Sequence, residues 1–191
     1  MSYIKKIPNS LKELLNVYSL AAIAMLLALR VVLGFFANAT LPLFSNTIKI
    51  SGAFLPIAVA GSMFGPIPAA LVGALGDIIS FIIAPTGGGF FPGFTISGFL
   101  TGMIFGIVLY KNKISLVRVI IAWAANMLLV ETFLNAYWLF ILYGGETPYL
   151  VYLSARFISV AVKCIPEIIL ILAVTKLASK IKIPRTLRKK V

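Results

Sequence analysis

The sequence predicts an all-α membrane protein, a bundle of six transmembrane helices forming a single domain over residues 1–191. Three observations predict this class. Hydrophobic residues make up 61% of the chain and charged residues only 12%, against roughly 25% charged in an ordinary soluble domain. Long apolar stretches alternate with short polar or Gly- and Pro-rich segments. Thirteen of the 17 Lys and Arg residues lie near the N-terminus, within 111–118 and near the C-terminus, the pattern of basic cytoplasmic loops.

The first expected span covers residues 15–37 and ends in a polar loop that contains Lys49. The next apolar stretch is longer than the roughly 20 residues that one span needs. Gly65-Pro66 interrupts it, and a helix usually ends before the residue that precedes a proline. We therefore expect two short helices, at 52–64 and 66–84. The Gly- and Pro-rich segment 85–93, called the glycine loop below, is too rich in turn residues for a helix.

Three further spans are expected at residues 95–110, 116–143 and 149–179, with Gly144-Gly-Glu-Thr-Pro148 as a turn between the last two. Both ends of the chain are basic, so both should lie in the cytoplasm, which requires an even number of crossings. Six spans satisfy this and place the basic segment 111–118 inside. We expect a multi-pass protein of the cell (plasma) membrane with cytoplasmic N- and C-termini.

Several functions are excluded by composition. The chain has no His and a single Cys164, which removes His-based triads, HExxH zinc sites and an intrachain disulfide. No GxxxxGK[ST] motif occurs, so the chain has no phosphate-binding loop for ATP. The clustering of the net charge of +12 argues against nucleic acid as a partner. We expect no enzyme activity, no cofactor and no metal.

Ionisable side chains inside membrane spans are costly and usually face the bundle interior or a water-filled cavity. At about 1.5 Å per residue, we expect Arg30, Asp77 and Arg156 roughly 10 Å below the outer surface. Glu131 and Lys163 should lie nearer 20 Å, and Glu167 deeper still. One interpretation is purely structural, with ion pairs between Asp77 and either arginine, and between Glu131 and Lys163. The other is a ligand site.

Helical spacing favours the ligand site. Glu131, Asn135 and Trp138 are spaced i, i+4 and i+7, which places them on one helix face. The last span has a second such face, formed by Arg156, Lys163 and Glu167. Carboxylates, cations, an amide and an indole that converge from two helices are typical of a pocket for a large polar ligand.

Two other features are candidates for function. Phe90, Phe91 and Phe94 lie in or beside the glycine loop, close to Gly93 and Thr95, where they could form a mobile lid over an outward pocket or a plain membrane turn. On the first span, small residues at i, i+3 and i+7 form a face suited to close helix packing, either within the bundle or against a partner. These residues are Ala21, Ala24 and Ala28.

Six segments in succession, covering nearly the whole chain, resemble the folate-specific substrate-binding subunit, or S component, of energy-coupling-factor (ECF) transporters. The segments are Arg30-Val-Val-Leu-Gly-Phe-Phe36, Thr47-Ile-Lys-Ile-Ser51, Phe54-Leu-Pro56, Met63-Phe-Gly-Pro66, Gly76-Asp-Ile-Ile79 and Phe90-Phe-Pro-Gly-Phe-Thr95. The resemblance implies a subunit that captures folate outside and docks on a transmembrane coupling subunit driven by two ATPase subunits. It also implies that the AxxxA face of Ala24 and Ala28 is the coupling surface.

Folate would be the ligand on this interpretation. Glu131 is the first choice to accept hydrogen bonds from the pterin edge, with Phe91, Phe94 and Trp138 stacking on the benzoyl ring. Lys49, Arg156 and Arg30 are candidates for the anionic glutamate tail, and Lys163 would pair with Glu131 or contact the pterin. The full substrate-binding set is Arg30, Lys49, Phe91, Gly93, Phe94, Thr95, Glu131, Asn135, Trp138, Arg156 and Lys163.

Two alternatives remain open. A self-sufficient secondary transporter or channel would use the buried Glu131, Lys163 and Glu167 to relay protons or ions, although the sequence shows no clear inverted repeat. An ECF S component for another vitamin would keep the fold and change the ligand.

Overall fold

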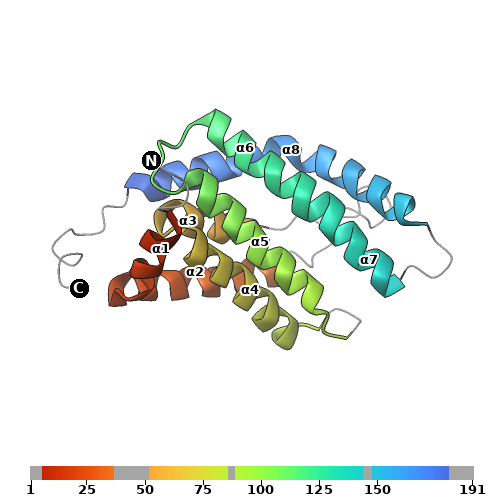
Figure 1. Cartoon of the computed structure of the whole chain (residues 1–191), viewed down its shortest axis with the longest axis horizontal. Coiled ribbons are helices and arrows are strands. Elements are labelled where there is room, and N and C mark those ends of the chain that lie inside the picture. Colours follow the sequence, from red (N-terminus) through yellow and green to blue (C-terminus); the bar gives the residue numbers. More distant parts are fainter. Residues whose placement is uncertain (1–5, 37–51, 86–88, 144–147, 181–191) are drawn as a thin grey trace.

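The computed structural model describes residues 6–36, 52–85, 89–143 and 148–180. Within these ranges the chain is helical and contains no strand (Figure 1). The elements, in chain order, are α1 (Lys6–Leu14), α2 (Val17–Phe36), α3 (Phe54–Met63), α4 (Pro66–Ile83), α5 (Pro92–Leu109), α6 (Leu116–Asn126), the π-helical segment η2 (Met127–Leu134), α7 (Asn135–Tyr143) and α8 (Tyr149–Lys180). The expected all-α membrane fold is confirmed for these residues, whereas the count of six spans is not established.

Four stretches are long and apolar enough to cross a membrane: α2, α4, α5 and the continuous α6–η2–α7. Helix α8 provides a fifth if its two parts, Tyr149–Ala161 and Lys163–Lys180, form one span bent by 53°. Pro166 lies inside this helix. A proline lacks the N–H donor and its ring clashes with the carbonyl four residues earlier, which here is the carbonyl of residue 162, at the bend.

Helix α3 is apolar but shorter than the candidate spans, so the number of spans depends on whether it crosses the membrane. It has only 10 residues, or about 15 Å at 1.5 Å per residue, roughly half the hydrocarbon core of a bilayer. Residues 56–61 are all buried, because α2, α4, α5 and α8 all pack around this helix. The next helix begins one turn further on, after Gly65 with φ of 97°, a backbone conformation that favours glycine.

Helix α1 was not expected from the sequence, which suggested only a basic segment before the first span. It packs against the start of α4. Ser10 is fully buried, and its Oγ accepts a hydrogen bond from the backbone N–H of Ile67 at 3.4 Å. The hydrogen bond fixes α1 against the α3–α4 turn.

Helices α4 and α5 pack closely because glycines face one another across their interface. A Cβ built at Gly73 would lie 2.0 Å from the carbonyl oxygen of Gly98, and one at Gly102 would lie 2.2 Å from that of Ala69. Small residues let helix backbones approach in this way in membranes. The pair forms a rigid wall on which the site is built.

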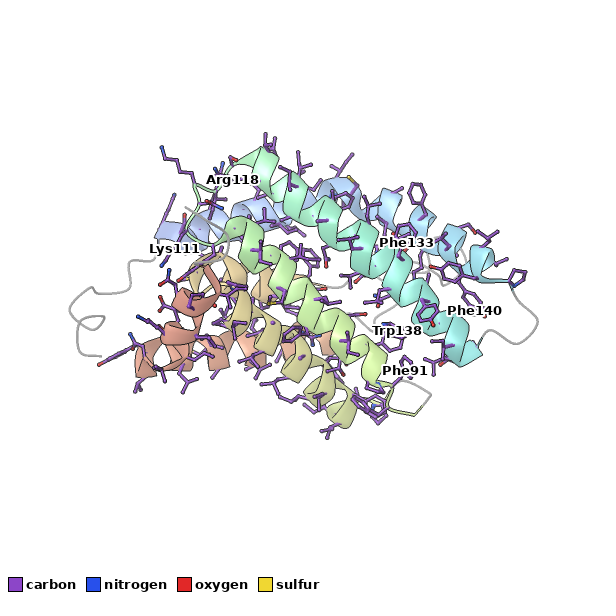
Figure 2. The ribbon with its side chains drawn as sticks, viewed as in Figure 1. Phe91, Lys111, Arg118, Phe133, Trp138 and Phe140 are labelled. Carbon is purple, nitrogen blue, oxygen red and sulfur yellow. The ribbon has the colours of Figure 1, made fainter. Side chains whose placement is uncertain are left out.

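The two ends of the bundle differ in character. Helix α1, the α5–α6 connection and the C-terminal end of α8 lie at one end, and the end of α4, the start of α5, the end of α7 and the start of α8 lie at the other (Figure 1). Lys111 and Arg118 mark the first end, whereas Phe91, Trp138 and Phe140 lie towards the second (Figure 2). The described basic loop and the aromatic residues are therefore segregated along the bundle axis.

Candidate functional site

Two adjoining chambers open inside the aromatic half of the bundle. The outer chamber has a volume of about 480 Å³ and is lined from α2, α4, α5, α7 and the end of the glycine loop. The inner chamber, of about 280 Å³, is lined from α2 to α8 and includes η2. Arg30, Ala53, Asp77 and Phe94 line both chambers, so the two are continuous. Together they fall within the 300–1,000 Å³ typical of ligand pockets.

All six ionisable side chains expected inside the spans line the inner chamber. Three are cations and three are carboxylates: Arg30, Arg156 and Lys163, and Asp77, Glu131 and Glu167. Among the described residues no cationic nitrogen of this set lies within 4.0 Å of a carboxylate oxygen. The expected structural ion pairs of Asp77 and of Glu131 with Lys163 are therefore not formed in this part of the chain. The charges are gathered but remain available to a ligand.

Arg30 stands where the two chambers meet. Its Nη1 approaches the hydroxyl of Ser80 at 3.5 Å, and its Nε is buried with no hydrogen-bond partner in the described structure. The side chain lies against Gly76, where a Cβ would come within 2.2 Å of the Cδ of Arg30. A buried guanidinium with an unused donor is suited to a carboxylate, which it can bind in bidentate fashion.

Thr95 and Gly93 support the site without lining either chamber. Thr95 Oγ1 donates a hydrogen bond to Asp77 Oδ2 at 2.8 Å, which links the start of α5 to α4. A Cβ at Gly93 would lie 2.2 Å from the ring of Phe91 and 2.7 Å from that of Trp138. Glycine at this position lets the two rings meet.

The aromatic residues form a cluster at the outer chamber. The ring centroid of Phe91 lies 5.9 Å from that of Phe94 and 5.6 Å from that of Trp138, both in edge-to-face arrangements. Figure 2 shows Phe91 and Trp138 at the same end of the bundle. Phe91 and Phe94 line the outer chamber, as does Phe90, so a planar ligand group in this chamber would meet aromatic faces or edges.

A short hydrogen-bond chain connects this cluster to the inner chamber. Trp138 Nε1 donates to Ser97 Oγ at 3.1 Å, and Ser97 Oγ donates to Asn135 Oδ1 at 2.6 Å. Ser97 was missed by the sequence reasoning, because serine is common in helices and no spacing singles it out.

Segment η2 alters the helix geometry around Glu131. The i, i+4 and i+7 spacing of Glu131, Asn135 and Trp138 assumes an α-helix, whereas Met127–Leu134 is π-helical and has more residues per turn. Single π-turns within α-helices often occur at functional sites. Glu131 lies inside η2 and Asn135 directly follows it, and both line the inner chamber.

The deep end of the inner chamber holds two groups that were outside the predicted set. Glu167 is only 4% exposed, and its Oε2 accepts a hydrogen bond from Trp123 Nε1 at 2.8 Å. Asn126 is 2% exposed, and its Oδ1 has no partner among the described residues. The sequence had marked Glu167 as a charge on the same helix face as Arg156 and Lys163, whereas nothing in the pattern singled out Asn126.

The other predicted residues lie elsewhere. Lys49 is outside the described residues. Ala21, Ala24 and Ala28 are exposed on α2, the span with the smallest buried share, 11% of its most apolar window. The small-residue face is therefore not covered by the described part of the bundle.

These features define a helical membrane protein with a charged and partly aromatic cavity inside its bundle. Residues 18–179 match the family model described as "ECF transporter, substrate-specific component", and the chain belongs to this family. It is thus a transport subunit rather than an enzyme, and a multi-pass protein of the plasma membrane. The resemblance noted from the sequence is confirmed.

Proteins of known function and structure agree with this assignment. Over 121 residues, 63% of this chain and 67% of the relative, the sequence is 38% identical to folate transporter FolT of Clostridium novyi (strain NT). It is 32% identical to folate transporter FolT of Leuconostoc mesenteroides subsp. mesenteroides over 123 residues, 63% of each chain. A crystal structure of FolT bound with folic acid is 31% identical, with a TM-score of 0.73 over 87% of this chain and 96% of that one.

Proposed function

We propose that this chain is the folate-binding subunit of an ECF vitamin uptake transporter, which captures folate at the outer face and delivers it inward. One observation carries the proposal: six ionisable side chains and an aromatic cluster line two continuous chambers. Folate combines a polar pterin, an aromatic ring and an anionic tail, and each part has a matching surface here. The relatives and the solved structure named above point to the same ligand.

The pterin is assigned to the inner chamber, where Glu131 accepts hydrogen bonds from its N–H groups. The benzoyl ring is assigned to the junction of the chambers, next to Phe94, which lines both of them. Phe91 and Trp138 belong to the same aromatic cluster. The glutamate tail then lies in the outer chamber with Arg30 at its boundary. The buried, unused Nε of Arg30 supports this choice, and Arg156 and Lys49 are further candidate cations.

The proposed topology has six spans with both termini in the cytoplasm. Its support is the segregation of basic residues, since exposed Lys12, Lys111 and Lys113 belong to α1 and the α5–α6 connection at one end of the bundle (Figure 1). Cytoplasmic loops favour Lys and Arg. Helix α3 brings the number of spans to six, although it is the second of them in chain order. Its short length is tolerated because neighbouring helices surround it.

The partners follow from the family and from the exposed face of α2. A transmembrane coupling subunit docks on Ala21, Ala24 and Ala28, and two ATPase subunits supply the energy. Small residues permit the close helix approach that such a contact needs. The chain itself uses no cofactor, and its ligand is folate.

A binding and an uptake experiment together test this function. The purified chain in lipid nanodiscs should bind folate, seen as quenching of Trp fluorescence, because Trp138 adjoins the proposed site. In liposomes, the chain alone should not accumulate labelled folate, whereas the chain with coupling and ATPase subunits should do so with ATP. ATP-independent accumulation by the chain alone would favour a secondary transporter and contradict the proposal.

A further inference from the structure

The orientation of one amide in the inner chamber is determined by its neighbours. An indole N–H can only donate a hydrogen bond, and a serine hydroxyl carries one proton. Trp138 Nε1 donates to Ser97 Oγ at 3.1 Å, so Ser97 acts as acceptor towards the indole. Its own proton is then free for Asn135 Oδ1, which lies 2.6 Å away. The oxygen of Asn135 is thus turned towards Ser97, which leaves its two amide N–H donors for other partners.

Most of the helical serines with a hydrogen bond given for the described chain use the hydroxyl within their own helix. Five donate to a backbone carbonyl there: Ser10 to Ile7, Ser62 to Val59, Ser80 to Gly76, Ser154 to Val151 and Ser179 to Lys176. That local bond is the ordinary choice for a serine in a helix. Ser19 instead donates to Glu13 Oε2 of α1, and Ser97 links α5 to two side chains of α7.

Asn135 is placed to use its N–H groups on a ligand. It lines the inner chamber and is 8% exposed, and its side-chain nitrogen has no hydrogen-bond partner within the described residues. Its neighbours in the chamber include the carboxylates of Glu131 and Glu167 and the unpartnered Oδ1 of Asn126, all of them acceptors. The chamber also holds the cationic donors Arg30, Arg156 and Lys163, and Asn135 adds an uncharged donor to them.

We infer that Ser97 is a positioning residue for ligand specificity: through the Trp138–Ser97–Asn135 chain it holds the Asn135 amide with its N–H groups towards the ligand. The ligand class selected is a planar heterocycle whose edge carries N–H donors for the acceptors and a ring nitrogen or carbonyl acceptor for Asn135. A pterin fits this pattern. The inference rests on the proposed folate function and adds to it a residue that lines the inner chamber and acts through Asn135.

A double-mutant cycle on folate affinity tests the inference. Ser97→Ala should weaken folate binding on the order of tenfold, the effect of one well-placed hydrogen bond. In an Asn135→Ala background the same substitution should change affinity by no more than about twofold, because Ser97 acts through Asn135. Asn135→Asp, which replaces the donor by an acceptor, should weaken binding more than Asn135→Ala. Ser62→Ala, whose hydroxyl bonds only within α3, is the matched control and should bind as wild type.

Spectroscopy supplies a second readout, one part of which uses the wild type alone. The chain has two tryptophans, so its indole N–H spectrum has two signals, and Ser97→Ala should shift only that of Trp138. In the wild type, folate should shift the side-chain amide signals of Asn135. An unchanged Asn135 amide at saturating folate, or additive effects of Ser97→Ala and Asn135→Ala, would overturn the inference while leaving the folate function intact. Failure of the wild type to bind folate would overturn both.

Discussion

Gly76→Ala is predicted to impair ligand binding through Arg30 rather than through the fold. A Cβ at this position would lie 2.2 Å from Cδ, 2.7 Å from Nε and 2.8 Å from Nη1 of Arg30, all far below van der Waals separation. The clash involves a flexible side chain and no backbone, so Arg30 should move away and α4 should persist. Alanine also favours a helix over glycine by up to about 1 kcal/mol.

The expected loss follows from the contact that Arg30 would make. A hydrogen bond to a charged group contributes about 1.5–3 kcal/mol, so folate affinity should fall by roughly 10- to 150-fold. Isothermal titration of the protein in nanodiscs measures this loss, and thermal unfolding should show a midpoint close to that of the wild type. Arg30→Ala should have a similar effect, and combining the two substitutions should add little.

Gly34→Ala is the matched control, since Gly34 also lines the outer chamber. There a Cβ would lie 3.5 Å from Ser80 Oγ, an ordinary contact, and folate affinity should stay within about twofold of wild type. Wild-type affinity of Gly76→Ala, or a large additional loss on adding it to Arg30→Ala, would refute the role assigned to Arg30.

Three further predictions concern the pterin contact, the helix packing and the partner surface. Glu131→Gln should lower folate affinity by more than about 1 kcal/mol, because a charged hydrogen bond is lost; a smaller change in titration means that the pterin lies elsewhere. Gly102→Ala should destabilise the bundle by about 1–3 kcal/mol and lower the midpoint of thermal unfolding, because the added Cβ would meet the Ala69 backbone at 2.2 Å. Gly89→Ala is the control: its Cβ would have nothing within 4 Å, and the midpoint should not change. Ala24→Trp should abolish copurification with the coupling subunit and leave folate binding intact; continued copurification would exclude the α2 face as the docking surface.

The charges were the most predictable part of the site. Because an ionised side chain is costly in hydrocarbon, each one inside a span had to face the interior, and a small bundle has room for few interior cavities. Six residues scattered from Arg30 to Glu167 therefore line one chamber. The absence of direct ion pairs among them was not predictable, since spacing along helices does not fix the distances between helices.

The supporting contacts could not be predicted because they depend on packing between helices. Gly93 and Thr95 were predicted to bind the ligand; they line neither chamber and lie against Phe91 and Asp77, respectively. The role of Ser97 was not predicted. Most helical serines bond to their own helix, and the sequence does not mark the one that bonds to another helix instead. Segment η2 was missed for a similar reason, since its pattern of apolar residues resembles that of an α-helix.

The helix at the N-terminus was not predicted. Lys6–Leu14 contains a proline, two lysines and a glutamate and was described only as a basic segment before the first span. It nevertheless forms α1, which packs against α4; its buried side chains are the polar Ser10 and Glu13, and Ser10 accepts a hydrogen bond from the backbone N–H of Ile67. Tertiary contacts can stabilise a short helix that would be marginal alone.

Mass spectrometry of the small molecules that copurify with the detergent-solubilised protein tests the central claim most directly. The account predicts a folate, bound in a ratio approaching one per chain and lost from Glu131→Gln. Recovery of thiamine or riboflavin in its place would contradict the folate assignment while leaving the family membership untouched.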